Sequence, residues 1–87
     1  MNSRTTRSFW KNFDSLPAGV RDQARKSYRL WRDDPSHPSL HFKRVHTREP
    51  LFSIRVSREY RALGLLEGNT MTWIWIGSHG AYERVLA

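Results

Sequence analysis

The chain has 87 residues, with 15 Lys and Arg against 8 Asp and Glu, a formal net charge of +7, and no cysteine. A chain of this length buries only about 60% of its unfolded surface, so it has room for one two-layer domain, residues 1–87, but not for a large substrate cavity. Lack of cysteine excludes disulfides and thiolate chemistry, and with no signal peptide and no long apolar run we expect a cytoplasmic protein without a membrane partner.

Two amphipathic helices are predicted in the first part of the chain. The first runs from about Thr6 to Ser15, with Thr5 or Thr6 as its N-cap. The second begins at Pro17, a residue suited to the first helical position, and ends near Asp33, before a proline-containing connection. The apolar residues that recur at helical spacing are Phe9, Trp10, Phe13 and Leu16 in the first helix, and Val20, Ala24, Tyr28 and Trp31 in the second.

A line of four arginines accompanies the apolar stripe of the second helix. Residues 1–48 hold 11 Lys and Arg against 4 Asp and Glu, whereas residues 49–87 hold 4 of each. This asymmetry favours contact with nucleic acid or the ribosome, followed by an acidic protein and then a membrane surface. The alternative is a solvated face with local ion pairs, such as Asp22 with Lys26. The four arginines are Arg21, Arg25, Arg29 and Arg32.

The second half of the chain has the pattern of β-strands. Its runs of β-branched and aromatic residues are separated by two short turns, and Gly68-Asn69 in the second turn is typical of a tight hairpin. A short edge strand is also possible at Leu40–Val45, where Lys43 and Arg44 would discourage pairing with another chain. The three main runs are Leu51–Val56, Tyr60–Leu66 and Thr70–Ile76.

The order of these elements predicts an α+β fold. Two N-terminal helices should pack on one face of a three- to four-stranded antiparallel sheet, and the other face should be open. Trp73 and Trp75 are expected on the same side of the last strand, where core packing explains them better than base stacking. Any strand before the first helix has only Asn2 to Arg7 to form from, and we expect it to be short or absent.

Two arginines are predicted to be neighbours on adjacent strands. Arg55 and Arg61 lie on either side of a short turn, so their Cβ atoms can be close. Two fixed cations repel each other unless an anion joins them, and a phosphate is the obvious candidate. The alternative is that a carboxylate, from Glu59 or Glu83, neutralises them.

One histidine after the last strand is a candidate for proton transfer. His79 lies between Gly77 and Gly80, and histidine exchanges protons readily near neutral pH. A single histidine is more often structural, so the residue alone does not establish a catalytic role. The other three histidines lack the spacing of a zinc site, and we expect neither a metal nor a cofactor.

These residues together resemble the RelE/ParE toxin superfamily, the toxins of type II toxin–antitoxin systems. The similarity covers nearly the whole chain and is most specific at Arg55-Val56, at Tyr60-Arg61 and at Ile76-Gly77-Ser78-His79, where the ending is closest to the YafQ and YoeB branches. It implies a RelE-like, microbial ribonuclease-like architecture. It also implies a ribosome-dependent mRNA endoribonuclease, an mRNA interferase that inhibits translation.

The resemblance implies a metal-free cleavage of RNA in which a 2′-OH attacks the neighbouring phosphate. It assigns Arg61 to transition-state stabilisation, Arg55 to phosphate contact and His79 to the general acid. Further candidates are Tyr82 for orienting a base, Glu59 or Glu83 as the general base, and Lys43 and Arg44 for contact with RNA. The implied partners are mRNA in the ribosomal A site and a small acidic antitoxin, which forms a hetero-oligomer with the toxin.

Two other functions are compatible with the same sequence. ParE members of the superfamily inhibit DNA gyrase and lack the ribonuclease residues, so a gyrase-inhibiting toxin is one alternative. The other is a noncatalytic nucleic-acid-binding module that uses the arginine line of the second helix.

Overall fold

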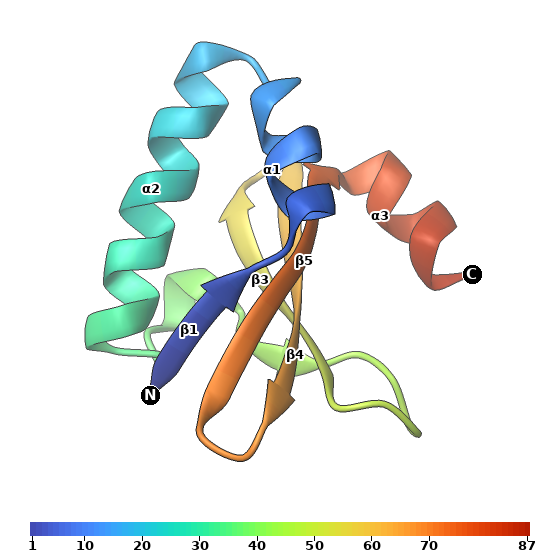
Figure 1. Ribbon diagram of the computed structural model, residues 1–87. Coiled ribbons are helices and arrows are strands. Elements are labelled where there is room, and N and C mark those ends of the chain that lie inside the picture. Colours follow the sequence, from blue (N-terminus) through green and yellow to red (C-terminus); the bar gives the residue numbers. More distant parts are fainter.

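A five-stranded mixed sheet forms the centre of the protein, as described for residues 1–87 by a computed structural model. The strand order is β1-β5-β4-β3-β2. Figure 1 shows α1 and α2 on one side of the sheet and α3 on the opposite side. The elements are β1 (Asn2–Thr5), α1 (Arg7–Asp14), α2 (Ala18–Asp33), the 3-10 helix η1 (Pro38–Leu40), β2 (Lys43–Arg44), β3 (Leu51–Ser57), β4 (Tyr60–Glu67), β5 (Thr70–Ser78) and α3 (His79–Leu86).

Both predicted N-terminal helices are confirmed, with a correction to the start of the second. The Thr6 side chain caps α1 by accepting a hydrogen bond from the backbone N–H of Phe9 at 3.1 Å. Pro17 is the N-cap of α2 rather than its first helical residue, because its ψ of 149° is not helical. Pro17 still serves the helix, since its carbonyl accepts hydrogen bonds from Val20 and Arg21.

The prediction of a purely antiparallel sheet of three or four strands is wrong. The short segment Asn2–Thr5 forms β1 and pairs in parallel with β5, Asn2 lying opposite Thr70 and Thr5 opposite Trp73. The segment is polar and has no period-2 apolar pattern, so its pairing depends on the neighbouring strand rather than on local sequence. The α+β class itself is confirmed.

The hairpin prediction around Gly68 is confirmed, and the edge strand is shorter than predicted. Gly68 has a φ of 60°, which suits a two-residue turn between Glu67 and Thr70. Of the predicted segment 40–45, Lys43 and Arg44 form the strand β2 that pairs with β3, and the backbone N–H of Val45 donates to the carbonyl of Leu51 at 2.8 Å. Leu40 instead ends the 3-10 helix and is completely buried.

A β-bulge in β5 separates two tryptophans that were predicted to share a face. Trp75 lies opposite Leu63 of β4, and Trp73 lies opposite the next residue, Gly64. Ile74, between the two tryptophans, is therefore an extra residue without a partner in β4. The extra residue reverses the alternation of side chains along the strand. Trp73 therefore faces α2, whereas Trp75 faces the opposite side of the sheet.

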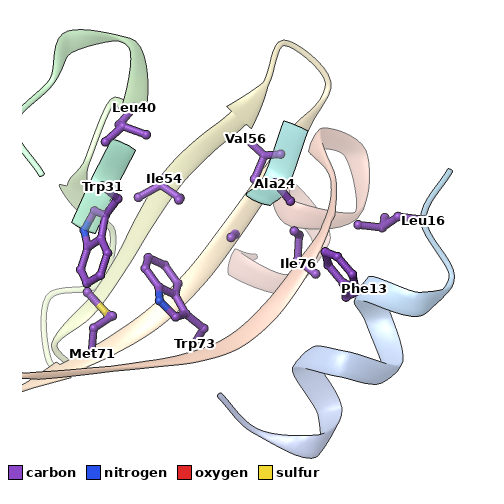
Figure 2. Close-up of a cluster of buried hydrophobic side chains, with 11 residues drawn as sticks. Phe13, Leu16, Ala24, Trp31, Leu40, Ile54, Val56, Met71, Trp73 and Ile76 are labelled. Atoms are coloured by element: carbon purple, nitrogen blue, oxygen red, sulfur yellow. The ribbon is translucent and has the colours of Figure 1, made fainter. Parts of the chain in front are cut away.

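The main core lies between the sheet and helices α1 and α2, on what we call the first face. Trp31 of α2 is 1% exposed and packs edge-to-face against Trp73 at a centroid distance of 5.1 Å. Figure 2 shows this pair beside Met71, with Phe13 and Ile76 at the other end of the same cluster. Neither buried indole nitrogen of the two tryptophans has a hydrogen-bond partner, which offsets part of the stabilisation from burying the rings.

Gly64 of β4 is required by close packing on the first face. A Cβ atom at this position would lie 2.6 Å from Sδ of the buried Met71 and 2.9 Å from Cε3 of Trp73. We therefore expect Gly64→Ala to lower the free energy of unfolding by about 1–3 kcal/mol in urea denaturation. Gly19→Ala in α2 is the matched control, because nothing lies within 4 Å of its Cβ position, and it should be neutral or stabilising by up to about 1 kcal/mol. Equal effects of the two substitutions would contradict this packing argument.

The other side of the sheet, the second face, is not open as predicted, because α3 covers part of it. Tyr82 of α3 lies 6.5 Å from the Trp75 ring, and its hydroxyl is 3.4 Å from Oγ of Ser53. Leu63, which lies between Ser53 and Trp75 in the strand register, is only 1% exposed. The turn-like sequence GSHGAY had given no apolar period from which α3 could be predicted. None of the three helices is long and apolar enough to cross a membrane.

Candidate functional site

The second face brings together the two arginines that were predicted to be neighbours. Arg55 of β3 lies directly opposite Arg61 of β4, and Arg61 in turn lies opposite Gly77 of β5. Directly opposed residues of antiparallel strands share a face, and Ser53 and Leu63 are on the same face one pair along. We call Arg55, Arg61 and the adjacent His79 the cation face.

The Arg61 side chain is fixed by the turn between β3 and β4. Its Nη1 donates to the backbone carbonyls of Ser57, Arg58 and Tyr60, at 2.8, 3.3 and 3.0 Å. Nε and Nη2 have no partner within the chain and can still donate to a ligand. Arg61 therefore has a structural role at the turn and is also held in place as a cation before any ligand arrives.

No carboxylate neutralises the pair, so the alternative of a local ion pair is wrong. Arg55 is half-buried and makes neither a hydrogen bond nor an ion pair within the chain. The side chain of Glu59 contacts exposed Arg58 at 3.9 Å, and that of Glu83 contacts His79 at 3.5 Å. Arg55 and Arg61 therefore share a face without a carboxylate partner, and an anion bound there would be attracted by both cations.

His79 is held at the same end of the sheet by the start of α3. It is the first residue of the helix, after the N-cap Ser78, whose hydroxyl accepts from the N–H of Ala81 at 3.2 Å. The backbone N–H of His79 donates to the carbonyl of Glu59 at 2.7 Å, which ties it to the β3–β4 turn. Its side chain is 42% exposed. The Nδ1 atom lies 3.5 Å from Glu83, so Nε2 is the ring nitrogen without a protein partner.

Tyr82 is placed beside this group, but it is committed to packing. Its ring lies between Trp75 at 6.5 Å and His79 at 5.8 Å, and its hydroxyl reaches Ser53. No side chain of α3 is fully buried, so Tyr82 supplies much of the contact that holds α3 to the sheet. The part of the Tyr82 ring that is still exposed lies next to His79, and only this part can contact a ligand.

Lys43 and Arg44 were predicted together, yet they lie on opposite faces. Lys43 pairs with Ser53 and shares the second face with Arg55, whereas Arg44 pairs with Phe52 and faces the other way. The Nε of Arg44 donates to the carbonyl of His46 at 3.0 Å. Of these two residues, only Lys43 therefore adds positive charge on the same face as Arg55.

The arginines of α2 lie on the first face, away from this site. Arg21 donates to the carbonyl of Leu16 at 2.7 Å, and Arg25 lies over the Phe13 ring at 5.1 Å. The ion pairs within the helix also differ from those proposed, because Asp22 pairs with Arg25 rather than Lys26. Arg25, Arg29 and Arg32 border a cavity between the helices and the sheet.

Comparison with known proteins identifies the family. A family model described as the ParE-like toxin domain matches residues 18–84. The chain belongs to this family. That membership confirms the resemblance to the RelE/ParE superfamily, and the protein is a toxin of that type.

Solved structures show the same fold in other members of the superfamily. The ParE-like domain superposes on a chain of the RelB–RelE antitoxin–toxin complex from Methanococcus jannaschii with a TM-score of 0.76 and 14% identity, covering 95% of this chain and 98% of that chain. YafQ from E. coli strain BL21(DE3) superposes with a TM-score of 0.73 and 11% identity, covering 93% of this chain and 96% of that chain. The YoeB/ParE toxin from Agrobacterium tumefaciens superposes with a TM-score of 0.72 and 16% identity, covering 91% of this chain and 99% of that chain. No curated protein matches the sequence significantly.

The sequence reasoning did not reveal what three residues of this ParE-like domain do on the second face. Trp75 lies on the second face beside Gly77, where an added Cβ would come within 2.6 Å of the indole. Gly77 therefore provides the space in which the Trp75 ring lies, and Ser53 anchors Tyr82 from β3. Residues two positions apart in a regular strand lie on the same face, so Trp75 was predicted to share the face of Trp73. The bulge at Ile74 places Trp75 on the other face.

The arrangement suits the binding of a phosphate next to a proton donor. Arg55 and the free nitrogens of Arg61 supply charge-assisted donors, and the N-terminus of α3 adds a partial positive charge at the same end of the sheet. His79 has a free ring nitrogen there. The site can therefore bind an anion, stabilise charge that develops on it, and transfer a proton to a leaving oxygen.

Proposed function

We propose that this ParE-like toxin is a ribosome-dependent mRNA endoribonuclease. The observation that carries the proposal is the cation face, in which two arginines without a counter-ion lie beside a partly exposed histidine. A gyrase inhibitor that does not act on phosphodiester bonds has no need of this histidine. Cleavage of RNA needs an anion site and a proton donor in the same place.

The proposed reaction is an internal displacement at phosphorus. The 2′-OH loses its proton to a base and its oxygen forms a bond to phosphorus, while the bond from phosphorus to the 5′-oxygen breaks. His79 donates a proton from Nε2 to that leaving oxygen. The products are a 2′,3′-cyclic phosphate and a 5′-OH, and no oxidant or further reactant is consumed.

Each residue of the cation face has a proposed role. Arg55 and Arg61 stabilise the extra negative charge on the pentacovalent phosphorus, and the contacts of Arg61 with the turn reduce the cost of placing it. Glu83 orients His79 through Nδ1, which leaves Glu59 as the carboxylate at this end of the sheet to act as base. Lys43 would contact the RNA backbone at the edge of the same face.

The proposed partners are mRNA in the ribosomal A site and an acidic antitoxin. Two of the structurally similar proteins were solved as RelE–RelB complexes, from Methanococcus jannaschii and Pyrococcus horikoshii. A net charge of +7 favours an acidic binding partner, because opposite charges speed association. We also propose a cytoplasmic location, where ribosomes are found.

The test is a translation assay with the purified protein, followed by primer extension on the mRNA. We expect discrete cuts with 5′-OH ends that require ribosomes, and about 10²–10³-fold slower cutting by Arg55→Ala, which removes one charged donor from the transition state. Arg7→Ala removes the same charge at the start of α1, on the first face, and should cut like the wild type. The absence of cuts by the wild-type protein, or equal rates for the two variants, would contradict the proposal.

Inhibition of DNA gyrase is the second candidate, and the match to the ParE-like family model favours it. It predicts that the protein blocks DNA supercoiling by purified gyrase and leaves mRNA intact in the same assay. Running both assays on one preparation separates the two functions. Inhibition of supercoiling that His79→Ala does not alter, without cuts in mRNA, would assign the protein to this second function.

A further inference from the structure

Trp75 is the one tryptophan of the chain whose indole N–H is neither buried nor hydrogen-bonded. The indole nitrogens of Trp31 and Trp73 are buried, and that of Trp10 donates to the Thr5 hydroxyl at 2.7 Å. Trp75 Nε1 makes no hydrogen bond within the chain, and its side chain is only partly buried. The bulge in β5 has moved this ring to the second face, outside the core between the sheet and α2.

The Trp75 ring lies directly beside the cation face. Its six-membered ring extends over Gly77, where an added Cβ would be 2.6 Å from Cζ2 and 2.9 Å from Cη2. Gly77 lies opposite Arg61, which in turn lies opposite Arg55, so the three form one row across β5, β4 and β3. Neighbouring strands lie about 4.8 Å apart. The base of a nucleotide whose phosphate binds Arg61 can therefore reach the indole.

The outer flank of the Trp75 ring is not covered by a strand. β1 pairs with β5 only as far as Thr5 opposite Trp73, so β5 has no strand beyond it at position 75. On the other flank the ring meets Tyr82 of α3, at a centroid distance of 6.5 Å and an interplanar angle of 37°. The two rings are tilted rather than stacked. A flat group can therefore approach the indole on the second face.

We propose that Trp75 stacks against the base of a nucleotide next to the phosphate bound by Arg55 and Arg61, and that it favours a purine. Every base has a π-face that can stack on an aromatic side chain, and the larger purines stack more strongly. The free indole N–H can also donate to an acceptor on the base or the backbone. The proposal rests on the proposed ribonuclease function, which brings a nucleotide to this place.

The indole is held in place before a nucleotide arrives. Gly77 lies beneath the ring, and Tyr82 lies beside it with its hydroxyl directed to Ser53. A ring that is already positioned loses little freedom on binding, so more of the stacking energy appears as affinity. Trp75 is therefore the residue that we assign to contact with the base, and Tyr82 supports it from the side.

The test measures binding of three 2′-O-methyl RNA trimers, which lack the free 2′-OH of the proposed reaction and cannot be cut. One carries three adenines, one carries three uracils, and one has the same backbone without bases. Nuclear magnetic resonance of the ¹⁵N-labelled full-length protein reports the affinity and the signal of each indole N–H. We expect the adenine trimer to shift the Trp75 signal and to bind at least about fivefold more tightly than the abasic trimer, with the uracil trimer between them.

Variants separate stacking from a structural role. Trp75→Leu keeps an apolar side chain beside Tyr82 and should lower the affinity for the adenine trimer about fivefold, to that of the abasic trimer. Its affinity for the abasic trimer should stay within about twofold of wild type, whereas a structural defect would weaken both. Trp10→Leu, on the first face, is the matched control and should change neither affinity. Arg55→Ala should weaken the binding of both trimers, because it removes a phosphate contact.

Four results would overturn the proposal. They are equal affinities of the wild-type protein for the adenine and abasic trimers, a Trp75 indole signal that does not move, an adenine affinity unchanged by Trp75→Leu, and no binding of the adenine trimer at about 5 mM. Equal affinities for adenine and uracil would overturn the preference for purines. The wild-type indole signal decides the question where Trp75→Leu does not fold. Because no trimer is cut and no ribosome is present, failure here is distinguishable from failure of the cleavage assay.

Discussion

His79→Ala is expected to lower the rate of mRNA cleavage by about 10²–10⁴-fold, the usual contribution of a positioned general acid. The side chain is 42% exposed, and its only polar contact is with Glu83 at 3.5 Å. Its loss should therefore leave the melting temperature nearly unchanged. Rates are measured by primer extension on ribosome-bound mRNA, and melting by circular dichroism.

Two further variants decide what the histidine does. Glu83→Gln keeps a hydrogen-bonding group beside Nδ1 and should lower the rate about tenfold or less, because it alters orientation rather than removing the acid. His41→Asn removes an exposed histidine at a positive φ of 46°, which asparagine tolerates, and should cut at the wild-type rate. A rate for His79→Ala within a factor of about three of wild type would exclude His79 as the acid.

Trp31→Ala is expected to have the largest effect on stability, about 3–5 kcal/mol. The ring is 1% exposed and contacts Tyr28, Phe42 and Trp73 at centroid distances of 5.1–6.1 Å. A domain of this size is stable by only about 5–15 kcal/mol, so the loss is a large part of the total. Urea denaturation followed by circular dichroism measures it.

Trp31→Phe keeps the prediction testable where Trp31→Ala does not fold. Phenylalanine retains one aromatic ring against Trp73 and removes the indole N–H, which is buried without a partner. Both variants remove that donor, and only Phe keeps a ring in contact with Trp73, so we expect the Phe variant to lose less than half as much stability as the Ala variant. A Phe variant as unstable as the Ala variant would show that a ring in contact with Trp73 does not contribute to stability.

The helices and main strands could be predicted from sequence because their signals are local. The Thr6 cap and the helical spacing of apolar residues determined α1 and α2, and the short turn between β3 and β4 placed Arg55 near Arg61. Tight turns add to this, since Gly68 can adopt the positive φ that its hairpin requires. These features depend on residues a few positions apart.

The parts that the sequence did not reveal depend on contacts between distant residues. β1 is a strand only because β5 is beside it, and the extra residue Ile74 is recognised only by comparing β5 with β4. The bulge moves Trp75 to the second face, where Tyr82 packs against it and holds α3 over the sheet. No local period could encode these pairings.

The chain by itself therefore determined its two N-terminal helices and three main strands, its superfamily resemblance and a net charge of +7 concentrated in its first half. Only the tertiary structure decided how that charge is divided between the two faces of the sheet. Arg55, Arg61 and His79 lie on the second face, while Arg25, Arg29 and Arg32 of α2 border a cavity on the first. The physical reason is that sequence spacing gives the side of a helix or strand on which a residue lies. Packing against the rest of the chain decides whether that side contacts the core, another element or solvent.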